Sequence, residues 1–201
     1  MNEYEDMPED LKFGGYSVTQ YYIYKNNINK KPEFVSSEQF EELIKENGYE
    51  NILTRGIESN GNISGKEIAI KQFQNDIPYI AGRPELGSGV HGEGAYFSKG
   101  SSMLSNMYGD YSVRAFLSKK AKIIDSDNVE KMFESKASAK QKKELKYYED
   151  AFKKNVSRYN DLTINRATKS IKALMLGYHV IKDKRVYNVV DRSALIMERI
   201  K

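Results

Sequence analysis

A glycine-rich segment that continues directly into an aromatic run constrains the fold of this chain more than any other feature. Four glycines lie at positions 87, 89, 92 and 94, and the chain then reads Ala95-Tyr-Phe-Ser98. Glycine lets a ligand approach the main chain closely, and the aromatic run is typical of a β-strand. Together they suit a flat heteroaromatic ring with a polar amide, such as nicotinamide. The alternative interpretation is a loop that simply precedes a strand.

The glycine spacing does not indicate a dinucleotide-binding Rossmann fold. Gly87, Gly89 and Gly92 have the G-x-G-x-x-G spacing, but the chain then enters a strand rather than a helix. The helix N-terminus that binds a pyrophosphate in that motif is therefore missing. The Rossmann interpretation is excluded.

The amino-acid composition excludes several kinds of site and of reaction. The chain has 201 residues, enough for one substantial domain, and it has no run of about 18 apolar residues that would span a membrane. It has no cysteine for a disulfide, a zinc site or a thiol nucleophile, and His91 and His179 lack metal-ligand spacing. The acidic start of the chain lacks the apolar core of a secretory signal. We expect a metal-free cytoplasmic protein without membrane contact, and the net charge of +4 favours solubility over nucleic-acid binding.

Caps, turns and apolar periodicity predict an α+β fold with helices and antiparallel strands. Residues 1–30 are expected to form an N-terminal extension, and residues 31–201 the main domain. Ser36 or Ser37 should begin the first helix. Further helices are expected at 68–73, 101–108 and 164–176 and in a block at 128–159, with strands at 51–57, 95–98 and 113–124 (broken at 119–120) and a hairpin at 178–190.

The helical block at 128–159 is strongly basic. Residues 131–158 contain nine Lys or Arg against four Asp or Glu. A solvated helical face explains such a composition most simply. The alternative is a docking surface for nucleic acid or an acidic partner.

Three motifs, in order along the chain, resemble those of the ADP-ribosyltransferase superfamily. The first is Leu53-Thr-Arg-Gly56, a strand that ends in Arg-Gly. The second is Gly92-Glu-Gly-Ala-Tyr-Phe-Ser98, followed by Ser105-Asn-Met-Tyr108. The third comprises Gly177-Tyr-His-Val-Ile181 and the tail Tyr187–Leu195. The set covers about residues 50–197 and is most similar to domains of phage head-morphogenesis and polymorphic-toxin proteins. It implies a split, mainly antiparallel sheet flanked by helices.

The resemblance also implies a role for each matched residue, with NAD as co-substrate and no metal. Arg55 would hold the NAD phosphates or ribose through its planar fork. Tyr96 and Tyr108 would sandwich the nicotinamide ring, which is cationic before cleavage. The other implied contacts are Gly56 and Ser105 to the carboxamide, Gly94 to the ligand through its backbone, Ser98 behind the site, and His91 to the adenosine or phosphates. Each has a plain structural alternative, such as a turn glycine, a core tyrosine or a surface ion pair.

The chain departs from the family at the catalytic acid. The family carries a glutamate on the strand at 186–190, where this chain has Val186 or Asn188, depending on the alignment. Asn188 can bond ribose hydroxyls but cannot act as a base. The nearest carboxylates are Asp191 and Glu198, and we favour Asp191 because it directly follows the strand. Asp191 can alternatively cap the following turn.

The implied activity is mono-ADP-ribosylation: nicotinamide is cleaved from NAD, and ADP-ribose passes to a macromolecule. A protein target is expected, with nucleic acid as the alternative, and a phage or bacterial effector of this kind can have an inhibitor or immunity partner. Its place would be the cytoplasm or the virion. Two alternatives are an NAD glycohydrolase, which uses water as the acceptor, and a non-catalytic NAD-binding or interaction module.

Overall fold

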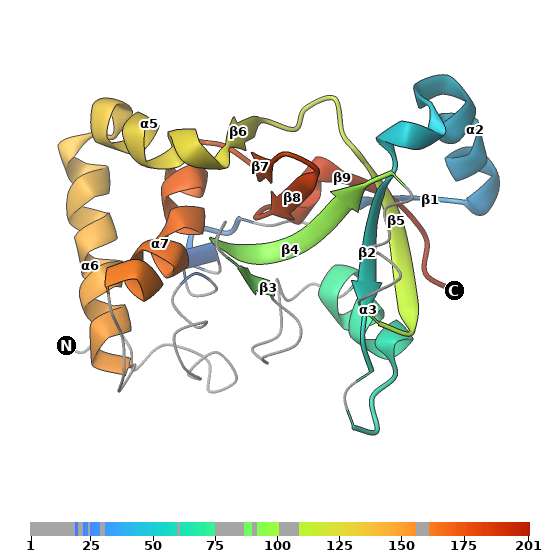
Figure 1. The fold of residues 1–201 in the computed structure, drawn as a ribbon, viewed down its shortest axis with the longest axis horizontal. Helices are drawn as coiled ribbons and strands as arrows, with labels where there is room; N and C mark the ends of the chain where they lie inside the picture. The colour runs from blue at the N-terminus through green and yellow to red at the C-terminus, as the bar shows by residue number, and fades with distance from the viewer. Residues whose placement is uncertain are drawn as a thin grey trace.

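The structure, a computed structural model, describes residues 19, 22–23, 25–28, 31–59, 61–74, 87–89, 92–100, 109–155 and 161–201. The chain forms an α+β fold around one mainly antiparallel sheet (Figure 1). The strands are β1 (Glu33–Val35), β2 (Leu53–Ile57), β3 (Gly87–Gly89), β4 (Gly92–Lys99), β5 (Tyr111–Leu117), β6 (Ile123–Asp125), β7 (Val180–Asp183), β8 (Val186–Val189) and β9 (Leu195–Glu198). The helices are α2 (Ser37–Asn47), α3 (Gly65–Phe73), α5 (Val129–Lys136), α6 (Ala139–Asn155) and α7 (Asp161–Met175), with short 3-10 helices η3 (Tyr49–Asn51), η4 (Ser126–Asn128) and η5 (Arg192–Ala194).

The sheet consists of two halves that meet through a short contact. The strand order is β1-β9-β5-β2-β4-β8-β7-β6, and β3 pairs separately with β4. β2 and β4 share only the pairs Leu53–Lys99 and Thr54–Ser98, whereas β2 pairs with β5 along all five of its residues. β2 and β4 therefore separate after Thr54, and Figure 1 shows the two strands crossing at a steep angle. Arg55 and Gly56 directly follow the last β2 residue that pairs with β4, so they lie at this point of separation.

Local sequence signals begin the helices. Ser36 caps α2 with a capping box, in which Ser36 Oγ accepts from the Gln39 N–H at 3.3 Å and Gln39 Oε1 accepts from the Ser36 N–H at 2.9 Å. A second capping box, between Ser64 and Glu67, begins α3. The same signal between Ser138 and Gln141 begins α6. The helical block expected at 128–159 is therefore two helices, α5 and α6, because Ala137 leaves the helical conformation just before the new cap.

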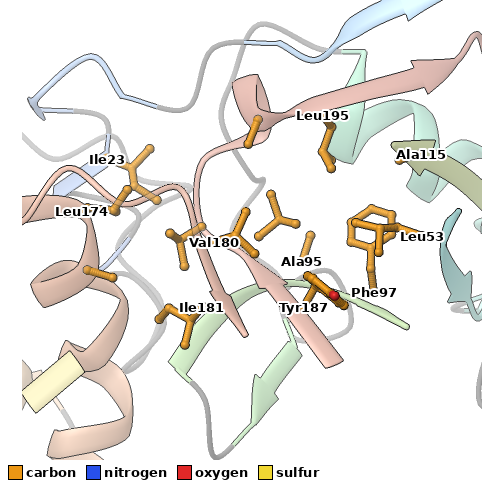
Figure 2. Close-up of a cluster of buried hydrophobic side chains, with 14 of the residues drawn as sticks. Ile23, Leu53, Ala95, Phe97, Ala115, Leu174, Val180, Ile181, Tyr187 and Leu195 are labelled. Carbon is orange, nitrogen blue, oxygen red and sulfur yellow. The ribbon is translucent and has the colours of Figure 1, made fainter. Parts of the chain in front are cut away.

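The main core lies where β4 and β8 alternate inward-facing apolar residues. Ala95 and Phe97 on β4 are buried in it with Tyr187 on β8, and Figure 2 shows them beside Leu53 of β2. Full burial of an apolar side chain as large as Phe97 or Leu53 stabilises the fold by about 1.5–3 kcal/mol. Tyr22 and Ile23 are also part of this core, although they fall within the segment expected as an N-terminal extension.

Several expected elements are confirmed. The helix from Ser37, the break between β5 and β6, and the β7–β8 hairpin occur as the sequence indicates. α3 begins three residues before the expected Ile68, at Gly65, because of its capping box. β1 and β9 were not expected as strands. The helix expected at 101–108 lies outside the described residues. Of the helices that the structure describes, none is long and apolar enough to cross a bilayer.

Candidate functional site

Arg55 of β2 bonds to β4 just beyond the point at which the two strands stop pairing. It lies in the middle of β2, opposite Val113 of β5, and only 8% of it is exposed. Its Nη1 donates a hydrogen bond of 3.2 Å to the main-chain carbonyl of Tyr96 on β4. A guanidinium is a rigid planar donor with five N–H groups, so this contact fixes its orientation. The result is a buried positive charge between the strands that carry the first two motifs.

Tyr96 and Asn188 lie directly opposite each other on β4 and β8. Side chains of such a cross-strand pair project to the same face of the sheet. Asn188 is fully buried, and Tyr96 is half-buried. A tyrosine and an asparagine therefore lie side by side, Tyr96 on β4 next to the strand of Arg55 and Asn188 on β8 one strand further.

Gly94 has no room for a side chain, because Asn188 packs against its backbone. A Cβ built on Gly94 would collide with Asn188 Oδ1 and would lie 2.8 Å from the Val189 carbonyl. The space above this glycine is therefore filled by the protein's own amide group. Gly94 contributes to the site by letting Asn188 pack against β4.

Ser98 lies at the last paired position of β2 and β4, beside the point at which the two strands separate, which we call the junction. Its Oγ donates to the Thr54 carbonyl at 3.4 Å, and the residue is 7% exposed. Gly56 follows Arg55 on β2, opposite Ser112 of β5. Both residues thus lie at the meeting of the two sheet halves.

Asp191 caps η5. Its Oδ1 accepts a hydrogen bond of 2.9 Å from the Ser193 N–H, and its own N–H donates to the His179 carbonyl at 3.1 Å. The residue lies two positions after the end of β8 and is 8% exposed. The capping role that its sequence position allowed is therefore present. Whether it also acts in chemistry stays a prediction.

Glu198 lies on β9, separated from β4 by β5 and β2 in the sheet order. Its Oε2 accepts hydrogen bonds from Nη2 and Nε of Arg114 at 2.7 and 3.2 Å. Arg114 also contacts Glu41 and lies 4.9 Å from the ring centre of Phe40. Partial burial alone would raise the pKa of Glu198, but the bonds from Arg114 and Ser37 outweigh it and leave that pKa lowered. Glu198 therefore serves a structural ion pair that fastens α2 to the sheet.

We expect Glu198→Gln to lower the stability of the fold at neutral pH. The lowered pKa means that the folded state binds this proton less readily than the unfolded chain. The stabilisation is thus fully present above the unfolded pKa, about 4.3, and is lost as the pH falls through the lower folded value. Melting temperatures measured from pH 7 to pH 3 should show the variant converging on the wild type below about pH 4. Glu46→Gln, an exposed control on α2, should follow the wild type throughout, and a constant gap for Glu198→Gln would contradict the ion-pair account.

Arg192 is a buried arginine whose role the sequence did not reveal. It is fully buried on η5, and its Nη1 donates to the Gln72 carbonyl of α3 at 2.6 Å. The bond ties the turn that contains Asp191 to the helix that follows β2. The signal in the sequence is weak, because a charged residue in a short turn is ordinarily solvated.

Replacing Arg192 with alanine should lower the free energy of unfolding by about 3 kcal/mol, because it removes a charged hydrogen bond and leaves a cavity. Arg192→Met refills most of the volume without the bond and should be less harmful. Urea denaturation of both variants measures the difference. Equal stability of the alanine variant and the wild type would show that this bond does not hold η5 in place.

The predicted site residues thus fall into three groups. Arg55, Gly56, Gly94, Tyr96, Ser98 and Asn188 gather where β2, β4 and β8 are neighbours, with Asp191 at the end of β8. Glu198 belongs to the separate cluster with Arg114. His91, Ser105 and Tyr108 lie outside the described residues. Within the described parts of the chain, no group of three or more His, Cys, Asp or Glu is placed to hold a metal ion.

Comparison of the chain with protein-family models, with curated proteins and with solved structures finds no match.

Proposed function

We propose that this chain is an NAD-dependent mono-ADP-ribosyltransferase domain that uses the junction of β2, β4 and β8 as its site. The observation that carries the proposal is the buried guanidinium of Arg55 bonded to the Tyr96 carbonyl, at the point where the two halves of the sheet separate. A sheet joined through only two residue pairs supports a split, ADP-ribosyltransferase-like arrangement. The motif order from Arg55 through Tyr96 to the tail after β8 supports it as well.

The donor set of the junction suits NAD as a substrate. A buried guanidinium matches phosphate or ribose oxygens through directional, charge-assisted hydrogen bonds. The half-buried ring of Tyr96 offers an aromatic face to the cationic nicotinamide. The Asn188 amide, on the same face of the sheet as Tyr96, suits ribose hydroxyls. Each group thus has a counterpart in one part of the dinucleotide.

The proposed reaction replaces one bond to the ribose anomeric carbon with another. The bond from that carbon to nicotinamide breaks, and its electron pair leaves with the neutral ring. The acceptor's nucleophile then bonds to the same carbon and gives up its proton to solvent water. Positive charge builds on the ribose in the transition state, as in glycoside hydrolysis, so a nearby carboxylate would stabilise it. We assign this role to Asp191, since it follows β8 directly and Glu198 is held by Arg114.

Label transfer tests the proposed function. The purified protein is incubated with NAD labelled in the adenosine part and with a bacterial lysate. We expect labelled protein and an equal amount of free nicotinamide. Nicotinamide release without labelled macromolecules would support the glycohydrolase instead. Absence of both products would contradict an enzymatic role.

A non-catalytic NAD-binding module is the second candidate, and one observation favours it. The two carboxylates nearest in sequence to the expected acid have structural partners, Asp191 in a cap and Glu198 in an ion pair, and the strand β8 itself carries Val186 and the neutral Asn188. Calorimetric titration with NAD separates the candidates. Binding without nicotinamide release supports the module, whereas turnover that depends on Asp191 excludes it.

A further inference from the structure

A surface groove lies at the β6 edge of the sheet, separated from β4 by β8 and β7 in the strand order. It has a volume of about 410 Å³ and runs between β6 and α5, which lie side by side in Figure 1. One wall is formed by Lys131, Met132 and Ser135 of α5 and by Asn128, the N-cap of that helix, at a spacing that places them on one side of it. Ile123–Asp125 of β6 and Tyr178 line the rest. Ile123 is 41% exposed, which is unusual for a large apolar residue on a strand.

The main chain of β6 offers hydrogen-bonding groups along this groove. β6 is the last strand of the sheet and pairs on one side with β7. Lys122 directs both main-chain groups toward β7: its carbonyl accepts from the Val180 N–H at 3.2 Å, and its N–H donates to His179 Nδ1 at 3.0 Å. Along a strand, the main-chain N–H and C=O groups of successive residues point to opposite sides. Since those of Lys122 point toward β7, those of Ile123 point away from β7, to the outer edge of the sheet. Within the described residues, nothing pairs with them there.

The groove lining holds one cation, Lys131, and one anion, Asp125, but the exposed charges of the segment 119–136, which contains β6 and α5, are predominantly positive. Lys119, Lys120, Lys122, Lys131 and Lys136 are all exposed on the segment 119–136. The same segment has four acidic residues, but two of them are engaged by other lysines: Glu130 by Lys172 at 2.7 Å and Glu134 by Lys142 at 3.2 Å. Asp125 and Asp127 are left against five lysines. An acidic partner is therefore favoured over a neutral or basic one.

We propose that this groove docks an extended acidic segment of a partner protein, which adds a strand to the outer edge of β6. Main-chain bonds to Ile123 would supply the pairing, as in other cases of strand addition. Alternate side chains of the segment would project toward the groove, where Ile123, Met132 and Tyr178 receive apolar groups. Acidic side chains of the segment would pair with Lys131 and the lysines before β6. The docking surface is independent of the proposed enzymatic site.

Fluorescence anisotropy with a designed peptide tests the docking surface. The probe is a fluorescein-labelled hexapeptide of alternating Val and Glu with blocked ends, and the matched peptide has Lys in place of Glu. The acidic peptide should bind at least about tenfold more tightly than the basic one in about 0.1 M salt. N-methylation of alternate peptide nitrogens should weaken binding by about tenfold or more, because it removes the donors that pair with β6. Equal binding of the acidic and basic peptides, or no effect of methylation, would overturn the proposal.

Two variants locate the binding. Lys131→Glu reverses the charge of this groove residue and should lower the affinity for the acidic peptide by about tenfold or more. Lys140→Glu, the same change on the exposed face of α6, should leave the affinity within about twofold of the wild type. Amide NMR shifts of the labelled protein should concentrate at Ile123–Asp125 and α5. Equal losses in both variants, or displacement of the peptide by a six-nucleotide oligothymidylate at similar concentration, would show a non-specific basic surface and overturn the proposal.

Discussion

Arg55→Lys is expected to lower kcat/KM for nicotinamide release from NAD by about 1,000-fold, or about 4 kcal/mol of transition-state stabilisation. Lysine keeps the positive charge and can still donate to the Tyr96 carbonyl. It lacks the planar fork that can bond Tyr96 and a substrate oxygen together. The loss should therefore fall on substrate orientation, with the melting temperature changed far less than the activity. Nicotinamide released per unit time, measured over a range of NAD concentrations, gives the ratio.

Arg114→Lys is the matched control for this prediction. Arg114 is an arginine of the adjacent strand β5, but its partners are Glu198 and Glu41. Its replacement should cost some stability and leave kcat/KM within about threefold of the wild type. Similar activity losses in the two variants would mean that Arg55 acts only through the fold.

The amide variant Asp191→Asn is expected to lower nicotinamide release by about 100- to 1,000-fold, as does the loss of one well-placed electrostatic group elsewhere. Asparagine caps helices about as well as aspartate, so the bond to the Ser193 N–H is retained. Asp191→Ala removes both the charge and the cap, and should lose about 1 kcal/mol of stability in addition. The difference between the two variants separates chemistry from capping. An Asp191→Asn protein with wild-type turnover would remove Asp191 from the mechanism.

Elements defined by neighbouring residues could be predicted from the sequence. Ser36 with Gln39 specifies the start of α2, and the charged turn before Val186 specifies the hairpin of β7 and β8. β1 and β9 could not be predicted, because each is only three or four residues long and they pair with each other in parallel across more than 160 positions of sequence. The strength of such a strand lies in its partners rather than in its own residues.

The candidate site follows the same division. The motif around Arg55 and the motif around Tyr96 were identified from the sequence, but the hydrogen bond that joins them was not. The packing of Asn188 over Gly94 also depends on the register of β4 and β8, which no local pattern specifies. The ion pair of Glu198 with Arg114 spans 84 positions, so the carboxylate appeared available in the sequence although it is engaged in the fold.

An amide NMR titration of the labelled protein with NAD is the sharpest test of whether the junction of β2, β4 and β8 binds NAD, because it reports binding whether or not turnover follows. We expect saturable shifts that concentrate at Arg55, Gly56, Tyr96 and Asn188, with Glu198 unaffected. The same titration of Arg55→Lys should require at least about tenfold more NAD to reach half-saturation. Shifts that are absent at millimolar NAD, or that map to the groove between β6 and α5 instead, would contradict the assignment of the junction as an NAD site.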